Sequence, residues 1–314
     1  MTRSRWQVSA SFGRAALAMS AFAVPSVAHA QASSPYETIN AAAAKDQIVA
    51  TPLRGGVTML QGSGGNMVVL SGPDGLLMVD TGIAISQQKI RRALDRLGKG
   101  SLRHVVSTHW HWDHTDGNGW ARRAGASIHA HPNTIARLSR TLRVVEWEHT
   151  FTPVAAEALP NVPVTAEKRL TQNGETIIIS PYAAGHTDGD LSVRFVKADV
   201  LAVGDTWWNG HYPFIDYVGG GGIDGVIAQA EASIALAGPG TQIVPGHGPV
   251  GSRADLVAYR DMLVDIRGRV AALKAAGRSL KEAVAAKPTA AYDAKWGTSL
   301  ISPALFTTLV YRGI

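Results

Sequence analysis

The densest group of potential metal ligands in the chain lies between Thr108 and His114. Three imidazoles and one carboxylate fall within six residues, at His109, His111, Asp113 and His114. If the period of two of a preceding strand persists, His109 and His111 point the same way, whereas the adjacent Asp113 and His114 diverge. One tetrahedral ion does not easily take all four side chains. The segment therefore predicts two metal ions side by side.

Three further candidate ligands stand beside glycines downstream. They are His186, Asp205 and His247, in the segments Gly185-His186, Gly204-Asp205 and Gly246-His247-Gly248. Each follows a predicted strand, and a neighbouring glycine permits the tight backbone that directs a side chain into a shared cleft at a sheet edge. The chain has no cysteine, which excludes thiolate zinc sites, iron–sulfur clusters and thiol nucleophiles. Nitrogen and oxygen donors suit zinc, with manganese or iron as lesser alternatives.

The segments that carry these residues alternate between strand and helix patterns. Short apolar runs bounded by turn residues predict strands at 57–60, 67–71, 76–79, 104–108, 127–130, 176–180, 191–196, 200–203 and 242–244. Apolar residues at helical spacing predict helices over 90–97 and 223–234, and a helical C-terminal part over 252–314. In that part, Ser252-x-x-Asp255 and Ser279-x-x-Glu282 have the form of capping boxes. Residues 31–56 are polar and Ala-rich, and we expect a loosely packed lead-in. The alternation indicates a layered α/β domain.

The first thirty residues have the pattern of a secretory signal peptide. Three arginines precede an apolar stretch from Ala15 to Val24, and Ala28-His29-Ala30 is a small-x-small cleavage site. The apolar stretch is too short to span a bilayer as a stable helix, and no stop-transfer pattern follows it, which disfavours the alternative of an uncleaved anchor. We expect cleavage after Ala30 and an exported protein, periplasmic or secreted, without membrane attachment.

The charge pattern favours a small-molecule substrate. The formal net charge is +6, and removal of the three arginines of the leader lowers it to +3. The sequence contains no Lys/Arg run and no basic stripe with interleaved aromatic residues, so we expect no nucleic-acid partner. Residues 31–314, in a chain that is 46% hydrophobic, suffice for one large domain with a substantial core.

The ligand pattern resembles that of the metallo-β-lactamase superfamily, whose signature is H-x-H-x-D-H followed by His, Asp and His on separate loops. The resemblance extends from about Val57 to about Gly248. It implies a single-domain, four-layer αββα sandwich, two zinc ions, and a turn at Asp80-Thr81-Gly82 that supports the site without binding metal. By this resemblance, the first metal is held by His109, His111 and His186, the second by Asp113, His114 and His247, and Asp205 bridges them.

The same resemblance implies a zinc-dependent hydrolase. Bound zinc lowers the pKa of water toward ~7 and polarises a carbonyl, so that a bridging hydroxide is the nucleophile. Asp113 and Asp205 are the candidates to orient it. His211 and Tyr212 follow Asp205 in a loop and are candidate substrate contacts, with loop packing as the alternative.

The presence of Asp205 and the absence of cysteine indicate which branches of the superfamily this chain resembles most. Those β-lactamases that use a cysteine ligand are excluded, and cysteine-free lactamases typically lack the bridging carboxylate. The resemblance is therefore nearer to lactonases and glyoxalase II-like thioesterases, and hydrolysis of an ester, lactone or thioester ranks before β-lactam hydrolysis. Nucleases and phosphodiesterases of this fold usually add basic elements, which this chain does not show.

Two further alternatives depend on losing part of the ligand set. Persulfide dioxygenases of this fold use a single iron with two histidines and one carboxylate, and a non-catalytic binding protein would have lost ligands. This chain keeps all seven ligand positions. Histidines outside the signature are not expected to bind metal, and Trp110 and Trp112 are expected to pack rather than to contact substrate. Gly219–Gly222 is expected to be a flexible loop, with a mobile flap as its functional alternative.

The leader assignment predicts the mature N-terminus. Protein isolated from its native host should begin at or near Gln31, as read by N-terminal sequencing. An intact Met1 on a cytosolic protein would contradict export.

Overall fold

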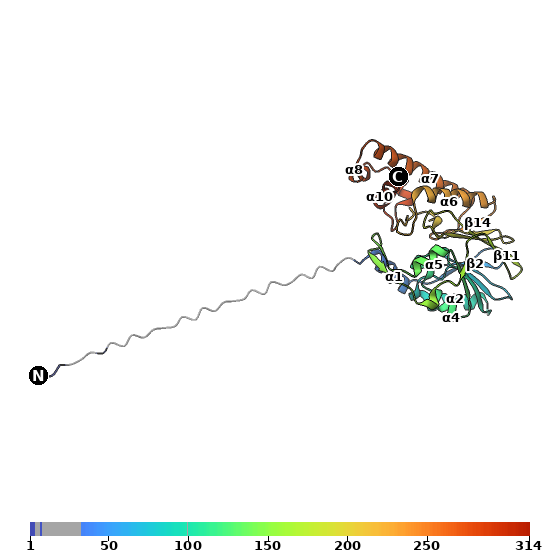
Figure 1. The fold of residues 1–314 in the computed structure, drawn as a ribbon, viewed down its shortest axis with the longest axis horizontal. Coiled ribbons are helices and arrows are strands. Elements are labelled where there is room, and N and C mark those ends of the chain that lie inside the picture. The colour runs from blue at the N-terminus through green and yellow to red at the C-terminus, as the bar shows by residue number, and fades with distance from the viewer. Residues whose placement is uncertain (4–6, 8–32, 99) are drawn as a thin grey trace. The chain divides into compact units, whose positions relative to one another are not determined.

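Two β-sheets form the centre of the fold (Figure 1). The computed structural model describes residues 1–3, 7, 33–98 and 100–314, so the predicted leader lies almost entirely outside the described residues. Residues 33–314 form one unit. The larger sheet consists, in spatial order, of β1 (Val49–Pro52), β2 (Val57–Gln61), β3 (Met67–Leu70), β4 (Leu76–Val79), β5 (Leu102–Val106), β6 (Ser127–Ala130) and β9 (Val162–Pro163). The smaller sheet consists of β10 (Lys168–Gln172), β11 (Glu175–Pro181), β12 (Leu191–Phe195), β13 (Val200–Ala202) and β14 (Gln242–Val244).

The direction of the strands places several loops at the same edge of each sheet. In the larger sheet β1 to β4 pair antiparallel, and β4, β5, β6 and β9 pair parallel. In the smaller sheet β10 to β13 pair antiparallel, and β13 pairs parallel with β14. The carboxyl ends of β4 and β5 therefore share one edge, and those of β11, β13 and β14 share another. A separate hairpin pairs β7 (Leu142–Val144) with β8 (His149–Phe151).

Helices connect the parallel strands and cover the sheets. The α-helices are α1 (Pro35–Lys45), α2 (Gln87–Leu97), α3 (Trp112–Thr115), α4 (Asn118–Arg123), α5 (Pro132–Leu138), α6 (Ile223–Leu236), α7 (Arg253–Ala275), α8 (Leu280–Ala285), α9 (Asp293–Trp296) and α10 (Pro303–Arg312). Short 3-10 turns are η1 (Ala84–Ser86), η2 (Ala156–Ala158) and η3 (Gly204–Thr206). Within the described residues, no helix combines the length and the hydropathy needed to cross a bilayer.

Alternate residues of the larger sheet face opposite layers. Val68 and Leu70 of β3 belong to a buried cluster with Phe195 of β12, which joins the two sheets face to face. Their neighbour Val69 belongs instead to a cluster with Ile90 of α2 on the outer face. This alternation buries both faces of β3, which is why its sequence is a continuous apolar run.

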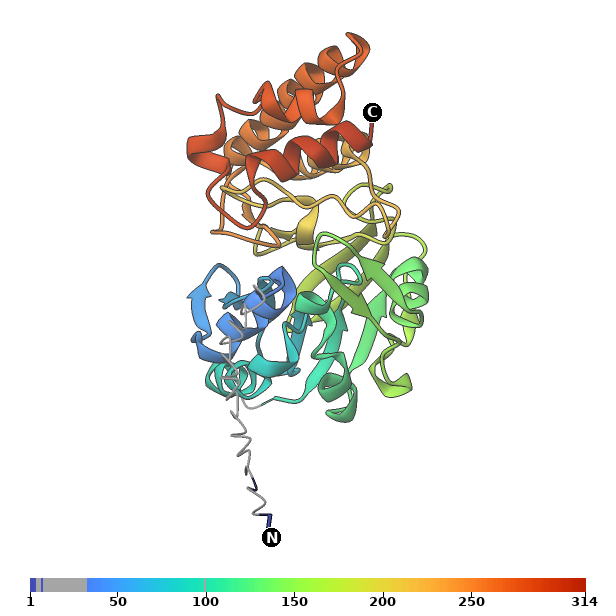
Figure 2. The same ribbon diagram turned by 90° about the vertical axis from the view of Figure 1, so that its left-hand side faces the viewer.

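The outer face of the smaller sheet is covered by the C-terminal helices. Leu201 and Ile243 cluster with Val226 of α6, Leu263 of α7 and Phe306 of α10. Figures 1 and 2 show these helices, coloured orange and red, on the opposite side of the sheets from α2 and α4. The order helix, sheet, sheet, helix is the four-layer αββα sandwich, and the predicted fold class is confirmed.

Of the predicted lead-in, the structure describes residues 33–56, and these contain a helix and a strand in place of the loose packing that their composition predicts. Residues 35–45 form α1, and residues 49–52 pair with β2 as an edge strand. Ser34 and Glu37 form a capping box, Pro35 occupies the first turn, and Ala43 is completely buried. The pattern Ser34-x-x-Glu37 is the same signal that predicts caps at Ser252 and Ser279, and both of those caps are confirmed.

The cap of α1 gives a stability prediction. Ser34→Ala should weaken α1 by ~1 kcal/mol, because the Glu37 amide loses its acceptor, whereas Ser34→Gly should cost only a few tenths. Hydrogen exchange of the backbone amides of residues 36–45 measures this difference. Equal protection in Ser34→Ala and wild type would show that packing alone holds the helix.

Candidate metal centre

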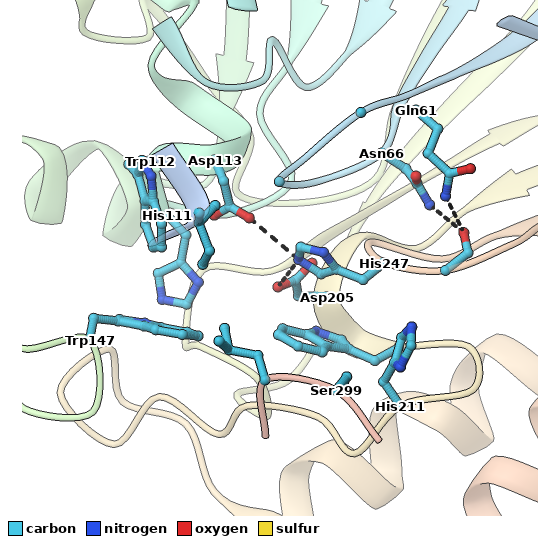
Figure 3. A pocket seen from close by; sticks show the side chains of 16 residues that line it. Gln61, Asn66, His111, Trp112, Asp113, Trp147, Asp205, His211, His247 and Ser299 are labelled. Carbon is cyan, nitrogen blue, oxygen red and sulfur yellow. Dashed lines mark hydrogen bonds and ion pairs between the residues drawn. The ribbon is translucent and has the colours of Figure 1, made fainter. Parts of the chain in front are cut away.

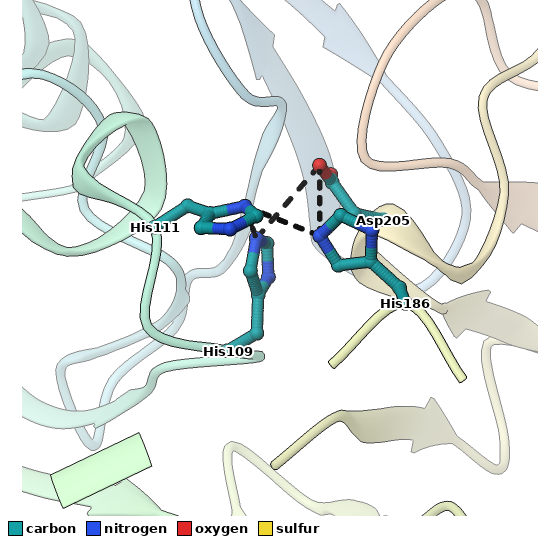
Figure 4. A group of neighbouring side chains, drawn as sticks. All are labelled: His109, His111, His186 and Asp205. Carbon is teal, nitrogen blue, oxygen red and sulfur yellow. Dashed lines mark hydrogen bonds and ion pairs between the residues drawn. The ribbon is translucent and has the colours of Figure 1, made fainter. Parts of the chain in front are cut away.

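Four predicted ligands from three separate loops meet at one point (Figure 4). His109 and His111 follow β5, His186 follows β11, and Asp205 lies in η3 after β13; all four side chains are buried. The Nε2 atoms of His109 and His186 lie 3.0 and 3.1 Å from Nδ1 of His111. The Oδ2 atom of Asp205 lies 3.8 Å from His109 Nε2 and 3.6 Å from His186 Nε2. We call these four residues the first ligand set.

The outward-facing nitrogens of His111 and His186 fix which atoms point inward without a proton. His186 Nδ1 lies 2.9 Å from the carbonyl oxygen of Phe214, which only accepts, so Nδ1 carries the hydrogen. His111 Nε2 lies 3.0 Å from Oδ2 of Asp216 and donates to it. In the neutral rings, His186 Nε2 and His111 Nδ1 are therefore the nitrogens without a proton, and both face the centre of the set.

The same reasoning fixes the ring of His109 through Thr108 and Asp80. The Thr108 hydroxyl donates to Asp80 Oδ2 over 2.8 Å, so its oxygen accepts from His109 Nδ1 at 3.0 Å. His109 Nε2 is then the third lone pair that points to the centre. Burial holds the pKa of His109 well below its usual value and lowers that of His186 to about 4, so both rings are neutral.

Three converging lone pairs repel one another unless a cation lies between them. Two atoms that each lie ~2.0–2.2 Å from one ion are at most about 4.4 Å apart. The separations from His111 Nδ1, 3.0 and 3.1 Å, and those from Asp205 Oδ2, 3.8 and 3.6 Å, all lie within this limit. The first ligand set therefore fits a divalent metal ion, with its rings held by hydrogen bonds from outside.

The remaining three predicted ligands form a second ligand set, Asp113, His114 and His247. Asp113 Oδ2 lies 3.7 Å from His114 Nε2 and 3.4 Å from His247 Nε2. Asp205 adjoins this set as well, because its Oδ1 is 3.0 Å from His114 Nε2 and its Oδ2 is 3.3 Å from His247 Nε2. All four separations are within the limit for ligands of one ion, so this set also fits a divalent metal.

The electrostatics of the second set favour positive charge. Burial acts to lower the pKa of His114, but the carboxylates of Asp205, Asp113 and Asp80 outweigh it and hold that pKa well above its usual value. Burial likewise acts to raise the pKa of Asp205, and the imidazoles of His247 and His114 outweigh it, so the carboxylate stays ionised. A proton on His114 thus takes the place that a metal cation fits, and metal binding would release it.

Asp80 supports both sets from behind. It follows β4 with a φ of 60°, a left-handed conformation that aspartate tolerates better than most residues. Its Oδ1 accepts the Thr108 amide at 2.7 Å, and its Oδ2 accepts His114 Nδ1 at 2.8 Å. The aspartate ties the loop after β5 to the strand end of β4 and leaves His114 Nε2 directed at the centre.

Sequence analysis missed Asp216, which holds His111. Its Oδ2 accepts both His111 Nε2 at 3.0 Å and Trp110 Nε1 at 2.8 Å, and its Oδ1 accepts the Gly219 amide at 2.7 Å. The available signal is a lone carboxylate inside the apolar run 214–218, directly before a glycine run.

The glycine run 219–222 packs against the site instead of standing free as a flap. The Gly221 amide donates to the Asp216 carbonyl at 2.7 Å, and the Gly222 amide donates to the Gly185 carbonyl at 2.8 Å. The run thereby links the loop that carries Asp216 to the loop that carries His186.

Two glycines are required by close approach to ligand side chains. A Cβ at Gly246 would lie 1.9 Å from Asp205 Oδ1, and a Cβ at Gly65 would lie 2.3 Å from His114 Nε2. Real Cβ atoms do not approach that closely, so a larger residue at either position would displace a predicted ligand.

A cavity of about 300 Å³ opens onto the second ligand set (Figure 3). Asp113, Asp205 and His247 lie in its wall, and the imidazole of His247 retains 19% side-chain exposure. The other lining residues are Ile39, Gln61, Gly62, Gly64, Asn66, His111, Trp112, Trp147, Trp208, His211, Gly248, Ser299 and Leu300.

Only one of the two predicted substrate contacts lines this cavity. His211 lies in its wall, and its buried Nδ1 has no hydrogen-bond partner among the described residues. The structure places Tyr212 elsewhere: its hydroxyl donates to Asp293 Oδ1 at 2.9 Å, and its ring stacks on Phe306 at 4.7 Å between centroids. Tyr212 therefore packs in the C-terminal helical layer, where its hydroxyl is not available to a substrate in the cavity.

The two tryptophans of the signature differ in position: one packs in the interior and the other lines the cavity. Trp110 is buried and donates to Asp216, as expected of a packing residue. Trp112 lines the cavity, contrary to the expectation that it only packs.

Histidines outside the signature have other partners. His129 is buried, and its Nε2 lies 3.1 Å from Nδ1 of His104. His131 caps α5, and His149 stacks on Tyr36 at 3.6 Å between ring centroids.

The sequence matches the family model described as "Metallo-beta-lactamase superfamily" over residues 60–247. This span includes more than half of the chain and all seven predicted ligands. The chain belongs to the metallo-β-lactamase superfamily. It is accordingly a hydrolase of that superfamily with two candidate metal-binding groups. No sequence among curated proteins matches it.

Solved structures share the fold at low sequence identity. DIM-1 metallo-β-lactamase is 20% identical with a TM-score of 0.54, and the match covers 69% of this chain and 97% of that one. A metallo-β-lactamase from Pontibacter korlensis is 17% identical with a TM-score of 0.56, and the match covers 70% of this chain and 100% of that one. The inverting sec-alkylsulfatase Pisa1 from Pseudomonas sp. is 16% identical with a TM-score of 0.62 over 88% of this chain, but only 54% of its own length is matched.

The role of Asp216 can be tested by metal affinity. Asp216→Asn should weaken binding of a divalent metal about 10- to 100-fold, because the carboxylate that orients His111 and makes it more basic is lost. Competition with a chromophoric chelator measures the affinity. Asp224→Asn, an exposed carboxylate paired with Arg267, is the matched control and should bind as wild type does. Wild-type affinity in folded Asp216→Asn would contradict the role.

Proposed function

We propose that this protein is an exported hydrolase that uses two zinc ions to cleave a carboxylic ester, lactone or thioester. The observation that carries the proposal is the position of Asp205 between the two ligand sets. One carboxylate oxygen lies near His186 of the first set and His247 of the second, and the other lies near His114. A carboxylate so placed is suited to bridge two cations and to reduce their mutual repulsion.

Two zinc ions at these sets would supply a water of lowered pKa and Lewis-acid polarisation of a carbonyl oxygen. The chain's own residues do the positioning. Asp113 and Asp205 place carboxylate oxygens in the cavity wall beside His247, where they can accept a hydrogen bond from a nucleophilic water. Asp80 and Asp216 hold His114 and His111 from behind, so the ligand atoms need little rearrangement when metal binds.

The donor set favours zinc among the divalent metals. The chain provides five imidazoles and two carboxylates for the two sets and no thiolate, and imidazole is a preferred ligand of zinc. A persulfide dioxygenase needs only one iron with two histidines and a carboxylate. The second ligand set would then bind no metal.

β-Lactam hydrolysis is the second candidate. The structures named as metallo-β-lactamases match this chain over 69% and 70% of its length with TM-scores of 0.54 and 0.56, which supports a shared fold. Because Asp205 is predicted to bridge the two metals, we rank hydrolysis of esters, lactones and thioesters above β-lactam hydrolysis. An activity panel that contains lactones, aryl esters, thioesters, cephalosporins, alkyl sulfates and phosphodiesters separates these classes.

Replacement of Asp205 tests the proposal. The wild-type protein should hold close to two zinc equivalents, lose activity with a chelator and recover it with zinc. Asp205→Asn is nearly isosteric but neutral, so it should lose the zinc of the second set first, and kcat should fall ~10²-fold or more. Metal analysis and steady-state kinetics measure both effects.

Asp261→Asn, an exposed carboxylate on α7 that pairs with Arg260, is the matched control and should keep wild-type zinc and activity. Two tightly held zinc ions and near-normal turnover in folded Asp205→Asn would refute the bridging role. One tightly bound iron, together with substrate turnover that depends on oxygen, would favour the alternative of a persulfide dioxygenase.

A further inference from the structure

We infer that the cavity beside the second ligand set selects small, uncharged esters or lactones that carry a flat, aryl-like group. This inference rests on the proposed ester hydrolysis and narrows its substrate class. It excludes esters with long acyl chains and thioesters of large anionic carriers. Three properties of the cavity carry it: its volume, the kind of side chain in its wall, and the charge of that wall.

The volume limits the part of a substrate that the cavity can enclose to about the size of a phenyl ester. The cavity holds about 300 Å³. An apolar cavity of ~150 Å³ is large enough to take benzene, so this cavity has room for one aromatic ring and an ester or lactone group beside it. A long acyl chain or a nucleotide-sized carrier would have to lie outside it.

The wall offers flat apolar surfaces beside the predicted ligands. Trp112, Trp147 and Trp208 line the cavity together with Ile39 and Leu300. In Figure 3 the indole of Trp147 lies below the imidazole of His111, and Trp112 and Asp113 lie above it. The Trp208 ring lies 4.2 Å from that of His247, centroid to centroid, so an aromatic face directly adjoins the second set. Aromatic rings pack best against other flat rings, in offset or edge-to-face contact.

The wall contains no cationic side chain. Among the described residues, none that line the cavity is a lysine or an arginine, and its polar members apart from the predicted ligands are Gln61, Asn66, His211 and Ser299. Asn66 Nδ2 is already bonded to the carbonyls of Pro245 and Gly248. The cations at this site would be the two metal ions, which face the reacting carbonyl. An anionic group at the far end of the substrate would therefore lose its hydration without a lysine or arginine beside it. The cavity therefore disfavours substrates with a second, anionic group.

The test compares matched substrates and a charge-introducing variant. Zinc-loaded protein is assayed with phenyl acetate, 4-carbamoylphenyl acetate and 4-carboxyphenyl acetate, the last two being similar in size but differing in charge. The wild-type kcat/KM for the carbamoyl ester should exceed that for the carboxylate ester about tenfold or more. Leu300→Arg places a cation in the wall at a residue that is 39% exposed, and it should narrow this ratio about two- to fivefold.

Leu236→Arg is the matched control, because Leu236 is 37% exposed at the end of α6 and does not line the cavity. It should leave the ratio unchanged. Binding is measured separately by calorimetry with two ketones that are not hydrolysed, benzyl methyl ketone and its 4-carboxy analogue. The uncharged ketone should bind more tightly to wild type, and Leu300→Arg should reduce that difference.

The outcomes separate the two claims. Equal or better turnover and binding of the carboxylate compounds by wild type would overturn the inference while leaving ester hydrolysis intact. Faster turnover of a dodecanoyl ester than of the acetyl ester would do the same. Preferential binding of the uncharged ketone, reduced by Leu300→Arg, with no ester, lactone or thioester cleaved would support the cavity's selectivity and refute the proposed function.

Discussion

The buried carboxylate of Asp205 is the constraint on which the rest of the site depends. Its oxygens lie 3.0 to 3.8 Å from nitrogens of four histidines that come from three separate segments of the chain. An ionised group so far from water is costly unless it is compensated by opposite charge. The imidazoles supply part of that compensation, as the depressed pKa of Asp205 shows, and a metal pair would supply more.

The fold provides the position that this carboxylate needs. Parallel pairing of β13 with β14 brings the loops that carry Asp205 and His247 to one edge, and β11 places His186 at the same edge. The larger sheet contributes its four ligands from the loop after β5. Close approach at Gly246 and Gly65 then allows backbone to pass directly beside Asp205 and His114, so these ligand positions are determined by backbone packing as well as by hydrogen bonds.

Local patterns in the sequence were sufficient to predict much of this arrangement. Apolar runs bounded by turns predicted nine of the twelve strands of the two sheets, and β1, β9 and β10 were missed. The spacing of His109, His111, Asp113 and His114 predicted a site with two ligand sets. The prediction of a loosely packed lead-in was wrong for its described part, residues 33–56, because composition was given more weight than the capping box at Ser34.

Features that depend on contacts between distant segments were not predictable in this way. Asp216 accepts a hydrogen bond from His111, which is 105 positions away in the sequence. The residues next to Asp216 in the sequence do not indicate that contact. Tyr212 is adjacent in sequence to His211, yet the backbone directs it into the C-terminal helical layer toward Asp293. Trp147 reaches the cavity from the hairpin of β7 and β8, a segment whose pairing the sequence analysis did not predict.

Anomalous diffraction at the zinc edge from crystals of the zinc-loaded protein tests the central claim most directly. The account predicts two peaks ~3.5–4 Å apart, one within the first ligand set and one within the second, with the Asp205 carboxylate in contact with both. A single peak, or two peaks of which only one is in contact with Asp205, would contradict it.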